Sequence, residues 1–335
     1  MIADGTRSTR EARNAGILRV VTRSVAFGVF LLLVAGALVT STESGLAVPD
    51  WPLSYGKVMP PMVGGILYEH GHRLVAAAVS TLVGLEMAML FFLERRKTVK
   101  LLGVAAFAAI LLQAALGGLT VLLLLPPAVS SAHAALAEIV FALTAVVALM
   151  CSRTWNDLTA RPLPLPLEED FSSSPFDLQS AFRATALATA AIYVQIVLGA
   201  VMRHTGAGLA IPDFPTAFGG ILPSASELAR RGVPIHLAHR AGAVVVLVLV
   251  LVAVRALGRL SFVSPVFTGF AAAFTGLVFI QILLGALSVW SQKAPPLTAA
   301  HLAGGALCWV TGVLATVCVG AWRKRANAIS SDIRA

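Results

Sequence analysis

Eight long apolar segments dominate this 335-residue sequence and restrict the folds that it can adopt. Each has about 20 residues, the length at which an α-helix crosses the hydrocarbon core of a bilayer. Because the runs are continuous rather than alternating, they exclude a membrane β-barrel. The sequence therefore predicts an all-α integral membrane protein with eight transmembrane helices, at about 22–40, 71–93, 101–124, 132–151, 183–202, 236–256, 266–290 and 298–320.

One passage occurs twice in the chain. Residues 46–52, LAVPDWP, return as residues 209–215, LAIPDFP, at an offset of 163. Each copy is followed by His-Arg, by Gln-x-x-x-Gly and by Ala-His-x-Ala, at offsets of 167 or 168. Such a repeat predicts two related structural units, here two tandem four-helix bundles. For the glutamines that precede glycine by four, Gln113, Gln195 and Gln281, packing between helices is the role we expect.

Polar segments divide the chain further. We expect a flexible cytoplasmic arm at 1–18, a first half at 19–153, a cytoplasmic linker at 154–182, a second half at 183–322 and a cytoplasmic tail at 323–335. The proline and glycine content of residues 41–70 and 203–235 predicts two turn-rich loops on the outer face.

The net charge of +9 is explained by topology rather than by nucleic-acid binding. Of the 25 Lys and Arg residues, 18 fall in segments on the side of the N-terminus, which the positive-inside rule assigns to the cytoplasm. The sequence thus predicts a multi-pass protein of the cell membrane, in contact with the lipid bilayer and with both termini in the cytoplasm.

Four histidines recur at equivalent positions in the two halves. His72, His133, His239 and His301 each lie at the outer end of an even-numbered helix, which places them at one depth. A heme between helices needs one imidazole from each face, so we expect one heme at His72 and His133 and a second at His239 and His301. A single histidine at a helix end often reaches interfacial water, but four related ones favour ligation. Zinc is a weaker alternative, since no cysteine or carboxylate recurs beside them.

Two arginines and one carboxylate lie beside these histidines. Arg73 and Arg240 each follow a candidate ligand, and an arginine there either binds a heme propionate or reaches lipid headgroups. Glu69 lies three residues before His72, where the second half has His236. A carboxylate in one half only indicates a site that handles protons as acid or base. The alternative is an exposed carboxylate at the end of a loop.

These motifs resemble those of the heme A synthase family. The resemblance covers about residues 30–320 and rests on Glu69-x-x-His72-Arg73, Pro49-Asp50-Trp51-Pro52, His133, His239-Arg240 and His301. It implies an oxidoreductase that oxidises the C8 methyl group of heme O to a formyl group and gives heme A for terminal oxidases. It also implies heme O as substrate at His72 and His133, with Glu69 beside it, and heme b as cofactor at His239 and His301. An enzyme that makes heme O and an oxidase assembly pathway are the implied partners.

Two other functions are compatible with parts of this pattern. A diheme b-type electron carrier would use the same four histidines but would not need Glu69 in one half only. A transporter with inverted repeats is the second alternative. However, each half here has an even number of helices, which makes the repeats parallel.

Overall fold

The computed structural model describes residues 2–160, 178–261 and 264–334, and it confirms the predicted helical class. Eight helices in these ranges are long and apolar enough to cross a membrane. They are α1 (Ile2–Ser41), α2 (Gly65–Leu93), α3 (Lys97–Leu122), α4 (Pro127–Met150), α6 (Leu178–His204), α8 (Val233–Gly258), α9 (Pro265–Trp290) and α10 (Pro295–Arg334). The short elements are α5 (Arg153–Ala160), the 3₁₀ helix η1 (Ala207–Leu209) and α7 (Ala225–Leu228).

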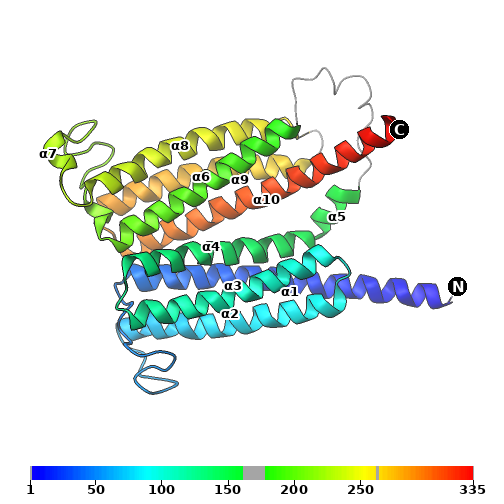
Figure 1. Cartoon of the computed structure of the whole chain (residues 1–335), viewed down its shortest axis with the longest axis horizontal. Coiled ribbons are helices and arrows are strands. Elements are labelled where there is room, and N and C mark those ends of the chain that lie inside the picture. The colour runs from blue at the N-terminus through cyan, green and yellow to red at the C-terminus, as the bar shows by residue number, and fades with distance from the viewer. Residues whose placement is uncertain (1, 161–177, 262–263, 335) are drawn as a thin grey trace.

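The long helices form two bundles of four. In the first, α1, α2, α3 and α4 each pack on the next, and α4 closes the ring against α1. In the second, α6, α8, α9 and α10 form a ring in the same way (Figure 1). The bundles meet where α1 and α4 lie against α6 and α10. Helices α2 and α4 therefore occupy opposite corners of their ring, as α8 and α10 do in theirs. This arrangement is consistent with the tandem repeat.

Glycine and proline set the beginnings of several helices. Pro127 and Pro265 start α4 and α9, where the missing N–H of proline would have no helical partner. Gly64 and Gly232 precede α2 and α8 with φ of 53° and 85°, a backbone conformation that favours glycine. These residues fix where the chain turns from the loops into the spans.

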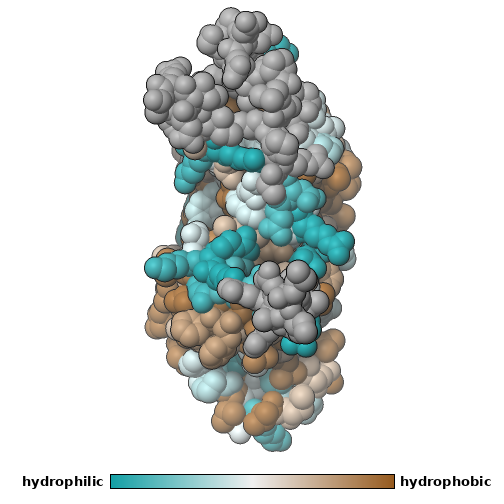
Figure 2. Space-filling model, turned by 90° about the vertical axis from the view of Figure 1, so that its right-hand side faces the viewer, coloured by the Kyte–Doolittle hydropathy of each residue, from teal (hydrophilic) through white to brown (hydrophobic). Residues whose placement is uncertain are grey.

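Both chain ends and α5 lie at one end of the molecule, opposite the two long loops (Figure 1). Hydrophilic side chains gather on that end, while apolar ones cover the flanks (Figure 2). The structure gives helix for residues 2–18, where the sequence predicted a flexible arm, because α1 begins at Ile2. The physical reason is that a helix already nucleated by a long apolar span can propagate into the residues that precede it. The linker expected at 154–182 falls largely on residues 161–177, outside the described residues.

Polar contacts near the loops join the two bundles. Arg203 of α6 donates to the Ser41 hydroxyl at the end of α1 (2.8 Å), and Thr298 of α10 donates to the same hydroxyl (2.9 Å). Deeper in the interface, the Tyr193 hydroxyl donates to the carbonyl of Ala135 in α4 (3.2 Å). Side chains close to the candidate site therefore contribute to the contact between the halves.

Candidate functional site

The four candidate histidines lie in the loop-side part of their helices. His72 is on α2 and His133 on α4, at opposite corners of the first bundle, and His239 on α8 and His301 on α10 repeat the arrangement. All four histidine residues are partly exposed within the spans. Each bundle thus presents two imidazoles from opposite helices.

A glycine on the neighbouring helix lies against each of these rings. The rings pack with Cε1 toward the glycine, on α1, α3, α6 and α9. A β-carbon added there would lie 3.1 Å from His72 at Gly36, 3.0 Å from His133 at Gly117, 2.9 Å from His239 at Gly199 and 3.4 Å from His301 at Gly285. A β-carbon at Gly36, Gly117 or Gly199 would press on the ring, whereas one at Gly285 would be in ordinary contact with it. All four helices of each bundle thus border the histidines. Sequence reasoning missed Gly36, although its offset of 163 from Gly199 equals that of the duplicated loops.

Three glutamines hold three of the histidines, rather than serving only the packing role expected from the sequence. Each donates from its side-chain amide to the backbone carbonyl of a histidine and contacts one ring nitrogen. Gln113 lies 3.0 Å from the carbonyl oxygen of His133 and 3.4 Å from its Nε2. Gln195 lies 2.7 Å from the carbonyl oxygen of His239 and 3.1 Å from its Nδ1. Gln281, with its amide oriented to satisfy its neighbours, lies 2.8 Å from the carbonyl oxygen of His301 and 3.0 Å from its Nδ1. Each glutamine therefore anchors its histidine at the backbone carbonyl and lies beside one nitrogen of the ring.

The donor set fits a heme. A heme can take two imidazoles as iron ligands, one from each side, and each bundle offers two. Nδ1 of His72 and of His133 is buried and has no hydrogen-bond partner within the described part of the chain. In the same part, no three His, Cys, Asp or Glu side chains gather into a group that could hold an ion. The two pairs of imidazoles are thus suited to an iron that already carries four equatorial nitrogens.

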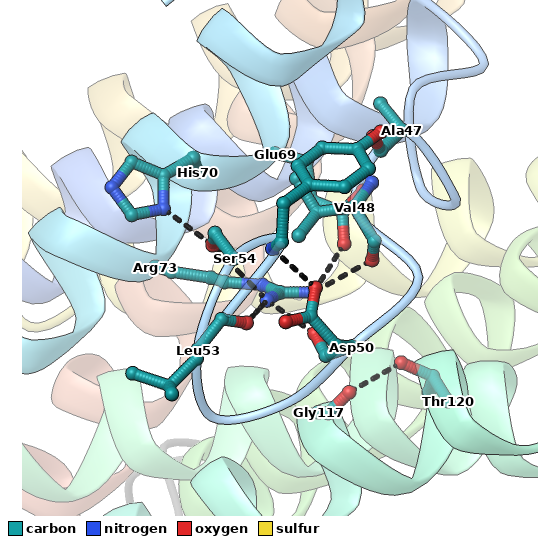
Figure 3. A network of polar contacts seen from close by, with 11 residues as sticks. Ala47, Val48, Asp50, Leu53, Ser54, Glu69, His70, Arg73, Gly117 and Thr120 are labelled. Atoms are coloured by element: carbon teal, nitrogen blue, oxygen red, sulfur yellow. Dashed lines mark hydrogen bonds and ion pairs between the residues drawn. The ribbon is translucent and has the colours of Figure 1, made fainter. Parts of the chain in front are cut away.

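Glu69 is buried, with 3% of its surface exposed, which excludes the exposed loop-end alternative. Its Oε2 accepts from the backbone N–H of Val48 (2.7 Å) and its Oε1 from Arg73 (2.6 Å; Figure 3). In the second half, Nδ1 of His236 accepts from the backbone N–H of Ile211 (3.2 Å). Since Val48 and Ile211 are repeat-related, the same loop amide is held by a carboxylate in one half and by an imidazole in the other.

Both arginines beside the candidate ligands bind loop carbonyls. The guanidinium group of Arg73 reaches from α2 to the first copy of the duplicated passage (Figure 3), and that of Arg240 reaches from α8 to the second copy. Arg73 donates to the carbonyls of Val48 (3.0 Å), Asp50 (2.7 Å) and Leu53 (2.9 Å), and Arg240 to those of Ile211 (3.3 Å), Asp213 (2.5 Å) and Thr216 (2.8 Å). Nε of Arg240 has no partner in the described residues, which leaves a donor for an anion. The contact with a heme propionate stays a prediction.

The duplicated loops fold back on themselves in the same way, as their turn-rich composition predicts. Asp50 accepts from the backbone N–H of Tyr55 (2.7 Å) and of the following residue (2.8 Å). Asp213 accepts in the same way from Phe218 (2.7 Å) and its successor (2.8 Å). The backbone hydrogen bonds lower the pKa of Asp50. The hydroxyl of Thr216, together with the backbone bonds, lowers the pKa of Asp213 to about 2. Charged carboxylates therefore stabilise both turns.

Aromatic side chains dock these loops on the bundles. The indole of Trp51 covers Gly118 of α3, where an added β-carbon would lie 2.7 Å from the ring. Phe214 meets Trp290 of α9 edge to face, with ring centroids 6.2 Å apart, and its carbonyl accepts from the indole N–H (3.1 Å). Each loop thus covers the end of a bundle at which the paired histidines lie.

Comparison with known proteins gives matches that span both bundles. Residues 65–313 match the family described as cytochrome oxidase assembly protein. The chain is 29% identical over 290 residues to a heme A synthase of Bacillus pumilus, which covers 85% of this chain and 89% of that protein. It is 30% identical over 241 residues to a heme A synthase of Symbiobacterium thermophilum, with 70% and 73% covered. A heme A synthase of Lysinibacillus sphaericus is 26% identical over 299 residues, with 86% and 92% covered.

Proposed function

Because this chain belongs to the heme A synthase family, we propose that it oxidises the C8 methyl group of heme O to a formyl group and so gives heme A for terminal oxidases. The family supports an oxidoreductase that acts on heme. One observation carries the assignment of roles to the two halves. At one buried position the first half has Glu69 and the second has His236, although both hold the same loop amide.

The first bundle is then the substrate site and the second the cofactor site. His72 and His133 would bind the iron of heme O, and His239 and His301 would bind a heme b. Heme iron supplies the redox chemistry that oxidation of an unactivated methyl group requires. The chain contributes the positions of the imidazoles, the glycines that leave room for the rings and the loops that cover both bundle ends.

Glu69 is the residue of this chain that we assign to catalysis. Its carboxylate is buried at the loop end of α2, three residues before His72, where it would hold or transfer a proton at Oε1 or Oε2 beside the bound substrate. Arg73 shares Oε1 and fixes the orientation of the carboxylate. Arg73 and Arg240 would also attract the propionates of the hemes, since both lie at the covered ends of the bundles.

A diheme electron carrier is the less favoured alternative. It would use the same two pairs of histidines, but it would not need a buried carboxylate in only one of two otherwise similar sites. The matched relatives, moreover, are named heme A synthase.

The eight apolar helices make this a multi-pass membrane protein. We propose the cell membrane as its location, with the polar end that carries both termini in the cytoplasm, because 18 of the 25 Lys and Arg residues fall in sequence segments assigned to that side. An enzyme that makes heme O would be its supplier, and an oxidase assembly pathway would receive its product.

Chromatography of extracted hemes tests the proposal. The protein is purified from cells that also express a heme O-producing enzyme. We expect heme A and heme b in the extract, and no heme A from cells without the protein. An extract that contains heme b alone would establish the electron carrier, and one without heme would refute both functions.

A further inference from the structure

A groove lies between the two bundles, in the half of the spans that is nearer the chain ends. Its volume is about 330 Å³, within the range of sites that hold small ligands, and it lies where α1 and α4 meet α10. Small and apolar side chains form its walls, and polar ones lie at one end of it. The walls include Ala26, Ala145, Ala148 and Leu314, and the polar residues include Arg23 and Thr154.

The apolar walls of the groove lie within one leaflet of the bilayer. On α1, Ala26 is ten residues before Gly36, which borders His72, and on α4 the lining residue Leu149 is 16 residues after His133. At a rise of about 1.5 Å per residue, these walls are about 15–24 Å from the histidines, toward the end that carries both termini. The hydrocarbon core is about 30 Å thick, so histidines near one surface place the groove in the opposite leaflet. The surroundings of the groove are therefore lipid rather than water.

Arg23 and the beginning of α5 supply the polar end of the groove. Arg23 is exposed and forms no ion pair within the described part of the chain. Thr154 adds an exposed hydroxyl from α5, which lies against α4 and α10 at this end (Figure 1). A guanidinium group and a hydroxyl are donors that bind phosphate oxygens, and a long arginine side chain extends from the apolar region to the headgroups. The groove thus combines an apolar channel with a cationic end.

The corresponding place in the second bundle is closed. There the hydroxyls of Thr189 and Thr316 lie 3.2 Å apart and join α6 to α10. The repeat relates these two threonines to two alanines that line the groove, and it relates the arginine of the groove to an alanine. The first bundle has Arg23, Ala26 and Ala148 where the second has Ala186, Thr189 and Thr316. The groove and its cation are therefore features of the first bundle and not consequences of the repeat.

We propose that this groove binds an anionic phospholipid of the leaflet nearer the chain termini. The phosphate contacts Arg23 and Thr154, and one acyl chain lies between α1, α4 and α10. Basic pockets between membrane helices bind anionic headgroups in this way. Because Leu314 belongs to the second bundle, the lipid joins the two halves at the end opposite the contacts of Ser41 with Arg203 and Thr298. Binding at this place does not require the proposed reaction.

Native mass spectrometry of the purified protein tests the proposal, with dioleoylphosphatidylglycerol and dioleoylphosphatidylcholine as probes. We expect the wild type to bind the anionic lipid more tightly than the zwitterionic one. Arg23→Gln should weaken binding of the anionic lipid about fivefold, the effect of one basic residue near an anionic headgroup, and leave the zwitterionic lipid unchanged. Arg255→Gln, at an exposed arginine in the last turn of α8, is the matched control and should change neither affinity. Equal binding of the two lipids by the wild type, or unchanged binding by Arg23→Gln, would overturn the proposal.

A second variant tests the apolar part of the groove. Ala26→Thr combined with Ala148→Thr transfers the threonine pair of the second bundle and should close the groove, so that tight binding of the anionic lipid is lost. In thermal unfolding, the anionic lipid should raise the melting temperature of the wild type but not that of the double variant. Retention of the lipid by a folded double variant would refute the proposed position of the acyl chain. If the double variant does not fold, Arg23→Gln decides.

Glycerol phosphate, which has the phosphate but no acyl chains, separates a lipid site from a site for free anions. In excess, it should not displace the anionic lipid from the wild type. Displacement would mean that the phosphate alone is recognised, and it would contradict the assignment of the groove to a phospholipid.

Discussion

Replacing Glu69 by Gln removes one negative charge from the first bundle and keeps the shape of the side chain. The carboxylate accepts two hydrogen bonds, from the backbone of Val48 (2.7 Å) and from Arg73 (2.6 Å). A glutamine has one acceptor oxygen, so its amide nitrogen must face one of these two donors. The substitution therefore costs one charge-assisted bond, about 1.5–3 kcal/mol of stability.

This loss should leave the protein folded. Arg73 keeps the carbonyls of Val48, Asp50 and Leu53 as acceptors, so its charge remains solvated by the loop. Conversion of heme O should nevertheless fall by about 10²–10⁴-fold, the usual contribution of a positioned acid or base, or about 3–5 kcal/mol of activation free energy. The chemical effect thus exceeds the structural one, and the two can be measured separately.

The assay is chromatography of extracted hemes, compared with the heme b absorbance of the same preparation. His236→Gln is the matched control, because it alters the side chain that holds the equivalent amide, Ile211 N–H, without removing a carboxylate. We expect little heme A with normal heme b from Glu69→Gln, and near-normal heme A from His236→Gln. A normal heme A yield from Glu69→Gln would refute the catalytic role. Loss of heme b together with activity would show that the carboxylate supports the fold.

His239→Ala and His301→Ala should each abolish the low-spin heme b spectrum, because each removes one of the two imidazoles that would hold the proposed heme b; unchanged spectra would refute the second site. Cysteines placed at the exposed residues Lys57 and Asp157 in a cysteine-free protein should differ in intact cells, with a membrane-impermeant reagent labelling only position 57. Labelling of position 157 alone would invert the topology. Asp213→Asn should lower thermal stability above pH 4, and its difference from the wild type should vanish as the pH falls toward 2. The reason is that the pKa of folded Asp213 is about 2, below the ordinary 3.8, so the stabilising bonds to its charged form are lost in that window. A difference that persists at pH 2 would contradict this account.

The spans were predictable because length and hydropathy alone determine whether a helix can cross a bilayer. The repeat predicted two bundles of four helices, and the helix contacts are consistent with it. The repeated loops are also alike, since each contains an Asp that accepts hydrogen bonds from backbone N–H groups in a turn. The extent of α1 and α10 was harder to predict. Their polar ends are helical because each continues a helix that the apolar span has already nucleated. No pattern in residues 1–18 alone carries that information.

The contacts of the site were only partly predictable. Spacing identified the histidines and the glycines one turn after the glutamines, but it could not show that Gln195 reaches His239, because that bond joins different helices. Likewise, an arginine beside a ligand is equally compatible with lipid, propionate or loop contacts. The structure places Arg73 and Arg240 among carbonyls that become neighbours only when the loop folds back over the bundle.

The two bundles differ most in where they bury negative charge. Three carboxylates are buried in the described chain, Glu69, Glu86 and Glu138, and all lie in the first bundle. In the second half, the residues that correspond to Glu86 and Glu138 in the repeat are Ala253 and Ala306, and both are buried. Both oxygens of Glu86 and Oε2 of Glu138 have no hydrogen-bond partner among the described residues, an arrangement that costs stability wherever it has no compensating use. A bundle that only holds a heme gains nothing from unpaired buried carboxylates, and the described part of the second bundle contains no buried carboxylate. A bundle that oxidises a methyl group must release protons, so the unpaired carboxylates lie in the half where the proposed reaction would produce them.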